Sequence, residues 1–233
     1  MLKKVLVLVF VAGLAVSMFG CGVTNFVGGK PVPQLDGYSK IVIAPIDLKK
    51  PSGKYDDLPT MLSYGAGNKL SIKFKEKSWY YDQSRDVKPV TDKMNELGLN
   101  RKELFAKSED AVKLAKAFDA DLIIVGTIEE PSFSIERSGK VEYDMQDSGP
   151  TGAARYYNVG QTAIIRSKLK IIDVSSGNVI WNGDLKSFKR YTTRYRTDQA
   201  EKLQREETMV ADIRKEYADN FVAKLYPERV PAK

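Results

Sequence analysis

Two short runs of almost uninterrupted apolar residues limit most strongly what this chain can fold into. The first run is residues 41–46, Ile-Val-Ile-Ala-Pro-Ile, and the second is residues 122–128, Leu-Ile-Ile-Val-Gly-Thr-Ile. Both runs are short and rich in β-branched residues, which is typical of strands that are covered on both faces. The chain is therefore expected to build a sheet with helices packed against it.

Helical patterns occupy most of the interval between the two runs. Residues 58–74 have apolar side chains at helical spacing, although Gly65 and Gly67 weaken this helix. Residues 89–118 are predicted to form further helices, and residues 79–81 (Trp-Tyr-Tyr) a short strand. The order across residues 40–128 is then strand, helix, strand, helix, strand.

The second half of the chain has mainly the alternating pattern of strands. Residues 131–145 predict an amphipathic hairpin that turns at Ser138 and Gly139, and residues 146–153 predict a loop. A long strand at residues 161–174 and its partner at 179–192 are joined by the turn Ser-Ser-Gly-Asn. A final helix is expected over residues 197–225, with a buried stripe that begins at Leu203.

These elements give an α/β (α+β) fold with a mixed central β-sheet, flanking helices, a long C-terminal β-hairpin and a final amphipathic helix. The most apolar strands and the stripe of the last helix supply the expected core residues, which are Ile43, Ile124, Val125, Leu169, Ile171 and Phe221.

The N-terminal segment has the pattern of a secretory signal peptide. Lys3 and Lys4 precede a short apolar run, and the segment ends in Gly20 and Cys21. A bacterial lipoprotein signal has a cysteine at this place, because its thiol receives a diacylglycerol before cleavage. Two alternatives are an ordinary signal with a chance cysteine and an N-terminal helix anchor. The apolar run is short for a spanning helix, which needs about 20 apolar residues.

Composition excludes several classes of function. The chain has no histidine and only one cysteine, so Ser-His-Asp and Cys-His arrangements and the usual zinc or haem ligands are missing. Loss of Lys3 and Lys4 with the signal lowers the formal net charge from +7 to +5. This mild basic balance does not indicate nucleic-acid binding in an exported protein. We expect no metal and no cofactor other than a covalent diacylglycerol or acyl lipid on Cys21.

Three local patterns have both a functional and a structural interpretation. Residues 65–69 (Gly-Ala-Gly-Asn-Lys) lack the spacing of a phosphate loop. The carboxylates at residues 129–147 alternate along the predicted hairpin, which is typical of a polar strand face rather than of a glycosidase pair. The basic and aromatic residues at 186–196 fit a polyanion site, but also a solvated strand face, which we favour. We therefore expect no catalytic residues and no enzyme activity.

The order of elements over residues 39–226 resembles the curli-secretion-channel lipoprotein family. It is also similar to the N-terminal domain of the Tol-Pal propeller protein and to the lipoprotein activators of penicillin-binding proteins. The resemblance rests on the strand at 41–45, the helix before residues 120–128 and the hairpin that turns at 174–181, and its most specific segments are residues 152–160 and 169–177. The channel family has two membrane-crossing hairpins per subunit. Here residues 131–165 are the one candidate, and the second is replaced by a direct run into the last helix.

The residues and the resemblance together give a domain plan. It comprises a lipoprotein signal peptide (1–20), a flexible tether (21–38), one α/β domain (39–226) with an extra hairpin and loop at 131–160, and a tail (227–233). Because Gly22 rather than aspartate follows the cysteine, the expected location is the outer membrane of a bacterial envelope, facing the periplasm, with surface exposure also open.

The function expected from this plan is a non-enzymatic assembly, secretion-accessory or regulatory role. The alternative is a subunit of an oligomeric outer-membrane secretion channel of the curli-transport type. Expected partners are the membrane, through the lipid on Cys21, and an envelope protein or a second copy of the chain, but not nucleic acid. The hairpin either provides an interaction surface or covers the domain's own sheet. The candidate interaction residues are Phe133, Ile135, Val141, Tyr143, Met145, Arg155 and Tyr156.

Overall fold

The computed structural model describes residues 35–149 and 152–226, without the side chains of residues 145–149 and 152–153. The predicted signal peptide, Cys21, most of the predicted tether and the tail lie outside the described residues. The rest is a mixed α/β fold, as the sequence predicts.

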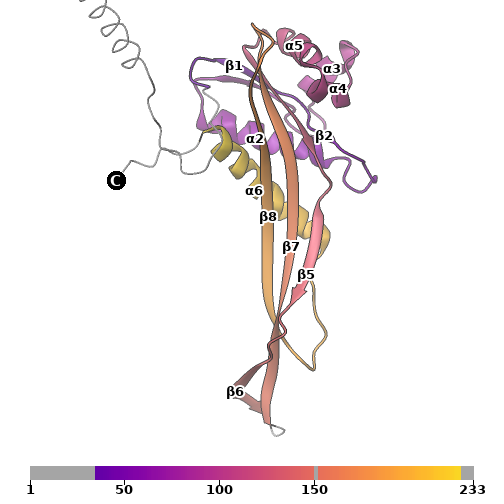
Figure 1. Ribbon diagram of the computed structural model, residues 1–233, viewed down its shortest axis with the longest axis vertical. Helices are drawn as coiled ribbons and strands as arrows, with labels where there is room; N and C mark the ends of the chain where they lie inside the picture. Colours follow the sequence, from indigo (N-terminus) through magenta and orange to yellow (C-terminus); the bar gives the residue numbers. More distant parts are fainter. Residues whose placement is uncertain (1–34, 150–151, 227–233) are drawn as a thin grey trace, which may run out of the picture. The chain divides into compact units, whose positions relative to one another are not determined.

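One mixed sheet contains all eight described strands (Figure 1). Parallel pairing joins β1 to β3 and β4, and antiparallel pairing joins β4 to β7. The strands are β1 (Lys40–Ile43), β2 (Asp47–Leu48), β3 (Ser78–Tyr80), β4 (Leu122–Ile128), β5 (Ser132–Arg137), β6 (Glu142–Gly149), β7 (Gly152–Asp173) and β8 (Val179–Arg196).

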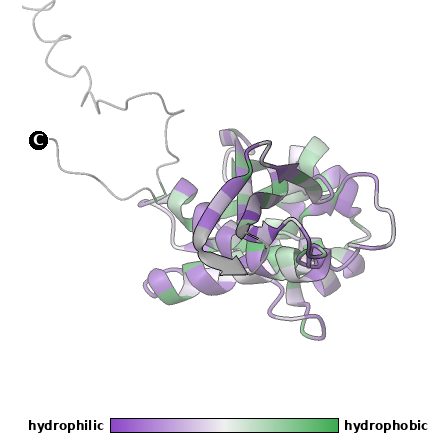
Figure 2. Cartoon of the chain, turned by 90° about the horizontal axis from the view of Figure 1, so that it is seen from below, coloured by the Kyte–Doolittle hydropathy of each residue, from purple (hydrophilic) through white to green (hydrophobic). Residues whose placement is uncertain are grey.

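Helices pack on both faces of the sheet and form a core on each. The helices α2 (Leu58–Lys73) and α6 (Glu206–Leu225) cover one face. The helices α3 (Pro89–Glu96), α4 (Arg101–Ala106) and α5 (Ser108–Lys116) cover the other face at β1 and β4. Hydrophobic and hydrophilic residues alternate along these elements, as expected where one side is buried (Figure 2).

The predicted core is confirmed. Every side chain of β4 is buried, because this strand lies between β1 and β7 with helices on both faces. All six expected core residues are at most 2% exposed, namely Ile43, Ile124, Val125, Leu169, Ile171 and Phe221.

The strand β7 is the spine of the second half of the fold. One of its edges pairs with β8 along most of its length, from Tyr156 to Ile172. Its other edge pairs in turn with β4, then β5, then β6. The strand is 22 residues long and continues well beyond the part of the sheet that the helices cover (Figure 1).

The predicted turn at Ser138 and Gly139 is wrong. The strands β5 and β6 do not pair with each other; both run antiparallel to β7, one after the other. The backbone N–H of Ser138 donates to the carbonyl oxygen of Asn158 at 2.8 Å, so the chain continues along β7 instead of reversing. The predicted loop at 146–153 is also wrong in part, because β6 extends to Gly149 and β7 begins at Gly152.

The last helix is shorter than predicted. It begins at Glu206 rather than at residue 197, and Leu203, which was expected on its buried stripe, lies before it and is 37% exposed. Residues 197–205 form a connecting segment, which we call the strap. Polar contacts hold the strap against the sheet, so the segment is ordered without burying an apolar stripe of a helix.

Candidate interaction surface

The predicted interaction residues lie on a part of the sheet that we call the arm. The arm consists of residues 132–149, which include β5 and β6, with residues 152–164 of β7 and residues 188–196 of β8 (Figure 1). Along β7, side chains alternate between two faces because successive residues of a strand point to opposite sides. The odd-numbered residues point to the same face as α6, and the even-numbered residues to the opposite face.

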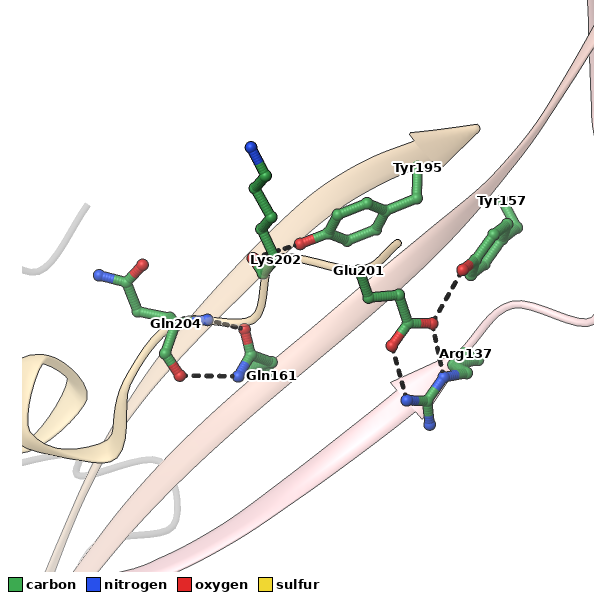
Figure 3. A network of polar contacts seen from close by, with 7 residues as sticks. All are labelled: Arg137, Tyr157, Gln161, Tyr195, Glu201, Lys202 and Gln204. Carbon is green, nitrogen blue, oxygen red and sulfur yellow. Dashed lines mark hydrogen bonds and ion pairs between the residues drawn. The ribbon is translucent and has the colours of Figure 1, made fainter. Parts of the chain in front are cut away.

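The strap crosses the odd-numbered face of the arm and is held by Glu201 (Figure 3). Arg137 on β5 donates from Nε and Nη2 to the two carboxylate oxygens of Glu201, at 2.7 and 2.6 Å. The hydroxyl of Tyr157 on β7 donates to the same carboxylate at 2.9 Å. These hydrogen bonds, that from Arg137 first, lower the pKa of Glu201, and the hydrogen bond to Glu201 raises the pKa of Tyr157.

Two further contacts fix the rest of the strap (Figure 3). The side chain of Gln161 donates to the backbone carbonyl of Gln204 at 3.1 Å and accepts from its backbone N–H at 2.7 Å. The hydroxyl of Tyr195 donates to the carbonyl oxygen of Lys202 at 2.5 Å. The strap is therefore ordered by polar side chains of β5, β7 and β8 rather than by an apolar residue of its own.

The predicted apolar face divides into a covered and an exposed part. Phe133 packs against the core, with its ring centroid 6.5 Å from that of Tyr55. Beyond it, Ile135, Val141 and Tyr143 are 45%, 44% and 63% exposed. The side chain of Met145 lies outside the described residues. The surface is thus closed over the domain's own core at Phe133. It is open to solvent at Val141 and Tyr143, which we call the tip of the arm.

The two other predicted residues, Arg155 and Tyr156, lie on opposite faces of the arm. Arg155 on β7 is directly opposite Tyr143 on β6, and its guanidinium carbon is 5.6 Å from the Tyr143 ring centroid. Tyr156 is on the even-numbered face, where the Arg194 guanidinium carbon lies 4.2 Å above its ring centroid. A single partner surface therefore contains Arg155 with Tyr143, but not Tyr156.

Ion pairs occupy the even-numbered face of the arm. Arg190 of β8 contacts Glu136 of β5 at 3.0 Å, across Gly160 of β7. Arg194 contacts Glu142 at 3.5 Å and Asp144 at 3.4 Å. The alternating carboxylates of this region are thus partners of the basic side chains of β8.

A surface hollow of about 500 Å³ lies at the other end of β7, but its carboxylates are already engaged. Asp173 accepts from Tyr38 and from the turn residues Ser175 and Ser176, and these bonds lower its pKa. Asp121 accepts from the backbone N–H groups of residues 39 and 40, which lower its pKa likewise. Hydrogen bonding of this kind makes both carboxylates structural.

The described part of the chain contains no group of three or more His, Cys, Asp or Glu side chains arranged to hold a metal ion. Within the same residues, no helix combines the length and the apolar character that crossing a membrane requires.

The comparisons find distant structural neighbours and no sequence relative. No protein-family model matches the chain, and no curated protein matches its sequence. The lipoprotein GNA1162 from Neisseria meningitidis is 14% identical, and the match covers 70% of this chain and 88% of that one with a TM-score of 0.37.

Two other solved structures are similarly distant. The PelC dodecamer from Paraburkholderia phytofirmans is 13% identical over 80% of this chain and 86% of that chain, with a TM-score of 0.35. The C-terminal domain of LpoB from Salmonella enterica is 11% identical over 69% and 86%, also with a TM-score of 0.35. TM-scores and identities this low do not indicate a shared function.

Proposed function

We propose that this protein is a bacterial envelope lipoprotein without enzyme activity. A lipid on Cys21 anchors it at the outer membrane, facing the periplasm, and the arm binds another envelope protein. Its role is assembly, regulation or assistance of secretion. The anchor part of the proposal rests on the basic, apolar and Gly20-Cys21 pattern of the N-terminal segment.

The observation that carries the proposal is the exposed tip of the arm. Val141, just before β6, and Tyr143, on β6, are 44% and 63% exposed, in a part of the arm that extends beyond the helices. Tyrosine and arginine are enriched among the residues that dominate binding energy at protein interfaces, and Arg155 lies beside Tyr143. A strand edge also offers unpaired backbone groups to a partner. Both features favour a protein contact at the tip.

The experiment compares two matched double variants of the full chain. Val141→Ser with Tyr143→Ser removes the exposed apolar side chains of the tip. Ile72→Ser with Val87→Ser is the control, because these residues are 61% and 51% exposed on other elements. A photo-reactive amino acid at Lys140, which is exposed next to the tip, reports the contact in intact cells.

We expect a discrete cross-linked product for the wild type and for the control, and its loss for the tip variant, with all three proteins equally stable. Loss of the product in both double variants, or its retention in both, would contradict the proposal.

A second candidate function is a subunit of an oligomeric secretion channel. The arm has two edges, since β8 pairs only with β7 among the described strands and β5 and β6 pair with the other side of β7. Basic residues (Arg190, Arg194, Arg196) are on β8, whereas Glu136, Glu142 and Asp144 are on β5 and β6. These charges pair with each other inside the arm, so the feature that favours pairing between copies is the unpaired backbone of its two strand edges.

The mass of the purified protein in mild detergent separates the two candidates. A ring of many subunits supports the channel, and a monomer or dimer supports the accessory role.

A further inference from the structure

A cluster of cations lies on the even-numbered face of β7 and β8, next to the arm. We call the site the basic patch. It consists of the cations Arg166, Lys168 and Lys186 and of the apolar residues Ile164 and Phe188 at the adjoining end of the arm. In the register of β7 and β8, Arg166 is directly opposite Lys186, and Ile164 is opposite Phe188. The three basic side chains are exposed, and Phe188 is 59% exposed. The helices α2 and α6 pack on the odd-numbered face of the same strands, so they lie on the other side of the sheet from the patch.

The cations of the basic patch differ from those of the arm because they have no ion-pair partner. Within residues 35–149 and 152–226, no carboxylate oxygen lies within 4 Å of a side-chain nitrogen of Arg166, Lys168 or Lys186. Asp184 is opposite Lys168 in the register but forms no such contact. Like charges directly opposite each other destabilise a sheet. An anionic ligand would neutralise this arrangement.

An exposed aromatic ring among these cations specifies the ligand further. Phe188 has no hydrogen-bonding group, so a soluble anion bound to the cations would leave its ring exposed to water. A surface of anionic phospholipids satisfies both features, because the phosphates accept from the cations while the ring enters the boundary of the acyl chains. The patch is on one face of two adjacent strands, so its side chains can meet a surface together.

The place where the chain enters the fold brings the patch within reach of a bilayer. Tyr38 donates to Asp173, the last residue of β7, and Arg166 lies seven residues before that end, about 25 Å away. The residues between Cys21 and the described fold, 22–34, span at most about 45 Å when fully extended. A lipid on Cys21 would therefore hold the chain close enough for contact.

We propose that the basic patch binds the anionic phospholipid surface of a membrane. The lipid on Cys21, which belongs to the proposed function, serves only to bring the patch near that surface. The patch is also separate from the tip of the arm, so the two sites are tested independently.

The test uses residues 21–233, the chain that remains after removal of the predicted signal peptide, with Cys21→Ser so that it cannot be acylated. Sedimentation with vesicles compares pure phosphatidylcholine with an equal mixture of phosphatidylcholine and phosphatidylglycerol. Arg166→Gln with Lys186→Gln removes two patch cations. Arg214→Gln with Lys215→Gln removes the same two charges from α6, on the opposite side of the sheet, where neither residue forms an ion pair with a described carboxylate.

We expect tighter binding to the anionic vesicles, lost at high salt because screening weakens surface electrostatics. The patch variant should bind them about 25-fold more weakly, about five-fold per cation, with an unchanged melting temperature. The α6 variant should bind as the parent does, and Phe188→Ser should weaken binding without changing its salt dependence.

Equal binding to both vesicle types, or equal loss in both double variants, overturns the inference. So does patch-dependent binding of soluble polyglutamate in the absence of vesicle binding, because it would identify the patch as a site for an acidic peptide.

Discussion

At the scale of single residues, Glu201 shows how one side chain orders a whole segment. Its carboxylate joins the strap to β5 through Arg137 and to β7 through Tyr157. Only 17% of its side chain is exposed, whereas 53% of the Arg137 side chain is. Glutamine at this position would accept fewer hydrogen bonds, because an amide NH2 replaces one of the two oxygens, and weaker ones, because it lacks the charge.

We predict that Glu201→Gln loosens the strap without unfolding the core. The amide hydrogens of residues 197–205 should exchange several-fold faster, while those of β4 remain as protected as in the wild type. The matched control is Glu76→Gln, because Glu76 is exposed and forms no ion pair with a described residue. Equal exchange in the two variants would show that the Glu201 contacts do not hold the strap.

The same contact predicts a dependence on pH. The pKa of Glu201 in the fold is below its unfolded value of about 4.3, so its contribution to stability is present above that value. The contribution is lost as the pH falls through the lower pKa of the folded state. The protection factors of the strap amides, which are corrected for the intrinsic pH dependence of exchange, should therefore fall only in the acid range, and Glu201→Gln should remove that fall.

At the scale of elements, two neighbouring glycines of α2 have different reasons to be there. A Cβ atom at Gly67 would lie 2.3 Å from Cγ of the Tyr81 ring. A Cβ atom at Gly65 would meet only the Cβ of Ala218, at an ordinary 3.5 Å. The first glycine permits the close packing of the Tyr81 ring on the helix, and the second has no such role.

We predict opposite effects for the two alanine variants. Gly65→Ala should stabilise the protein by about 0.5–1 kcal/mol, because alanine is the better helix former and restricts the unfolded chain. Gly67→Ala should destabilise it by about 1–3 kcal/mol, because the ring must move. Urea unfolding measures both, and a gain in stability for Gly67→Ala would show that the ring relocates at little cost.

The sequence is informative about elements wherever burial dictates the pattern. The strands β1 and β4 are recognisable because both of their faces are covered, and α2 because its apolar residues recur at helical spacing. The turn at Ser138 and Gly139 was misplaced because the two residues are typical of turns. Ile135 and Val141 are six positions apart, and an even spacing puts both side chains on the same face of a strand. The pattern therefore also fits one interrupted strand along β7.

The strap could not be predicted, for a physical reason. Its contacts join residues far apart in the chain, such as Arg137 and Glu201, and polar residues have no periodic pattern there. Leu203 is seven positions before Val210, a spacing that suits a helix, so the predicted helix began too early. The sequence pattern identified Ile135, Val141 and Tyr143 as a surface, and all three are exposed. It did not place Arg155 and Tyr156 on opposite faces of the arm, because that requires the register of β6 on β7.

At the scale of the whole molecule, the N-terminal end of the described fold and the tip of the arm are at opposite ends of β7. Tyr38, shortly after the start of the described fold, contacts Asp173, and the tip lies near the other end of the strand, at most about 70 Å away.

We predict that Cys21→Ser releases the protein from the outer-membrane fraction or mislocalises it, without unfolding it. Metabolic labelling with a fatty acid should mark the wild type and not the variant, because the thiol is the attachment site. The control is a serine at an exposed, unrelated position, such as Val87→Ser. A wild type that takes up no label would rule out the lipid anchor.

The continuity of β7 also determines how the molecule carries mechanical load. If the lipid holds the chain at one end and a partner pulls on the tip, tension passes along β7 and across β4 to β1. Antiparallel hydrogen bonds are perpendicular to their strands, so a pull along β7 shears the seven β4–β7 pairs together instead of opening them one by one. A protein built in this way would resist stretching between a membrane and its partner. It would yield first at its contact with the partner rather than in its core.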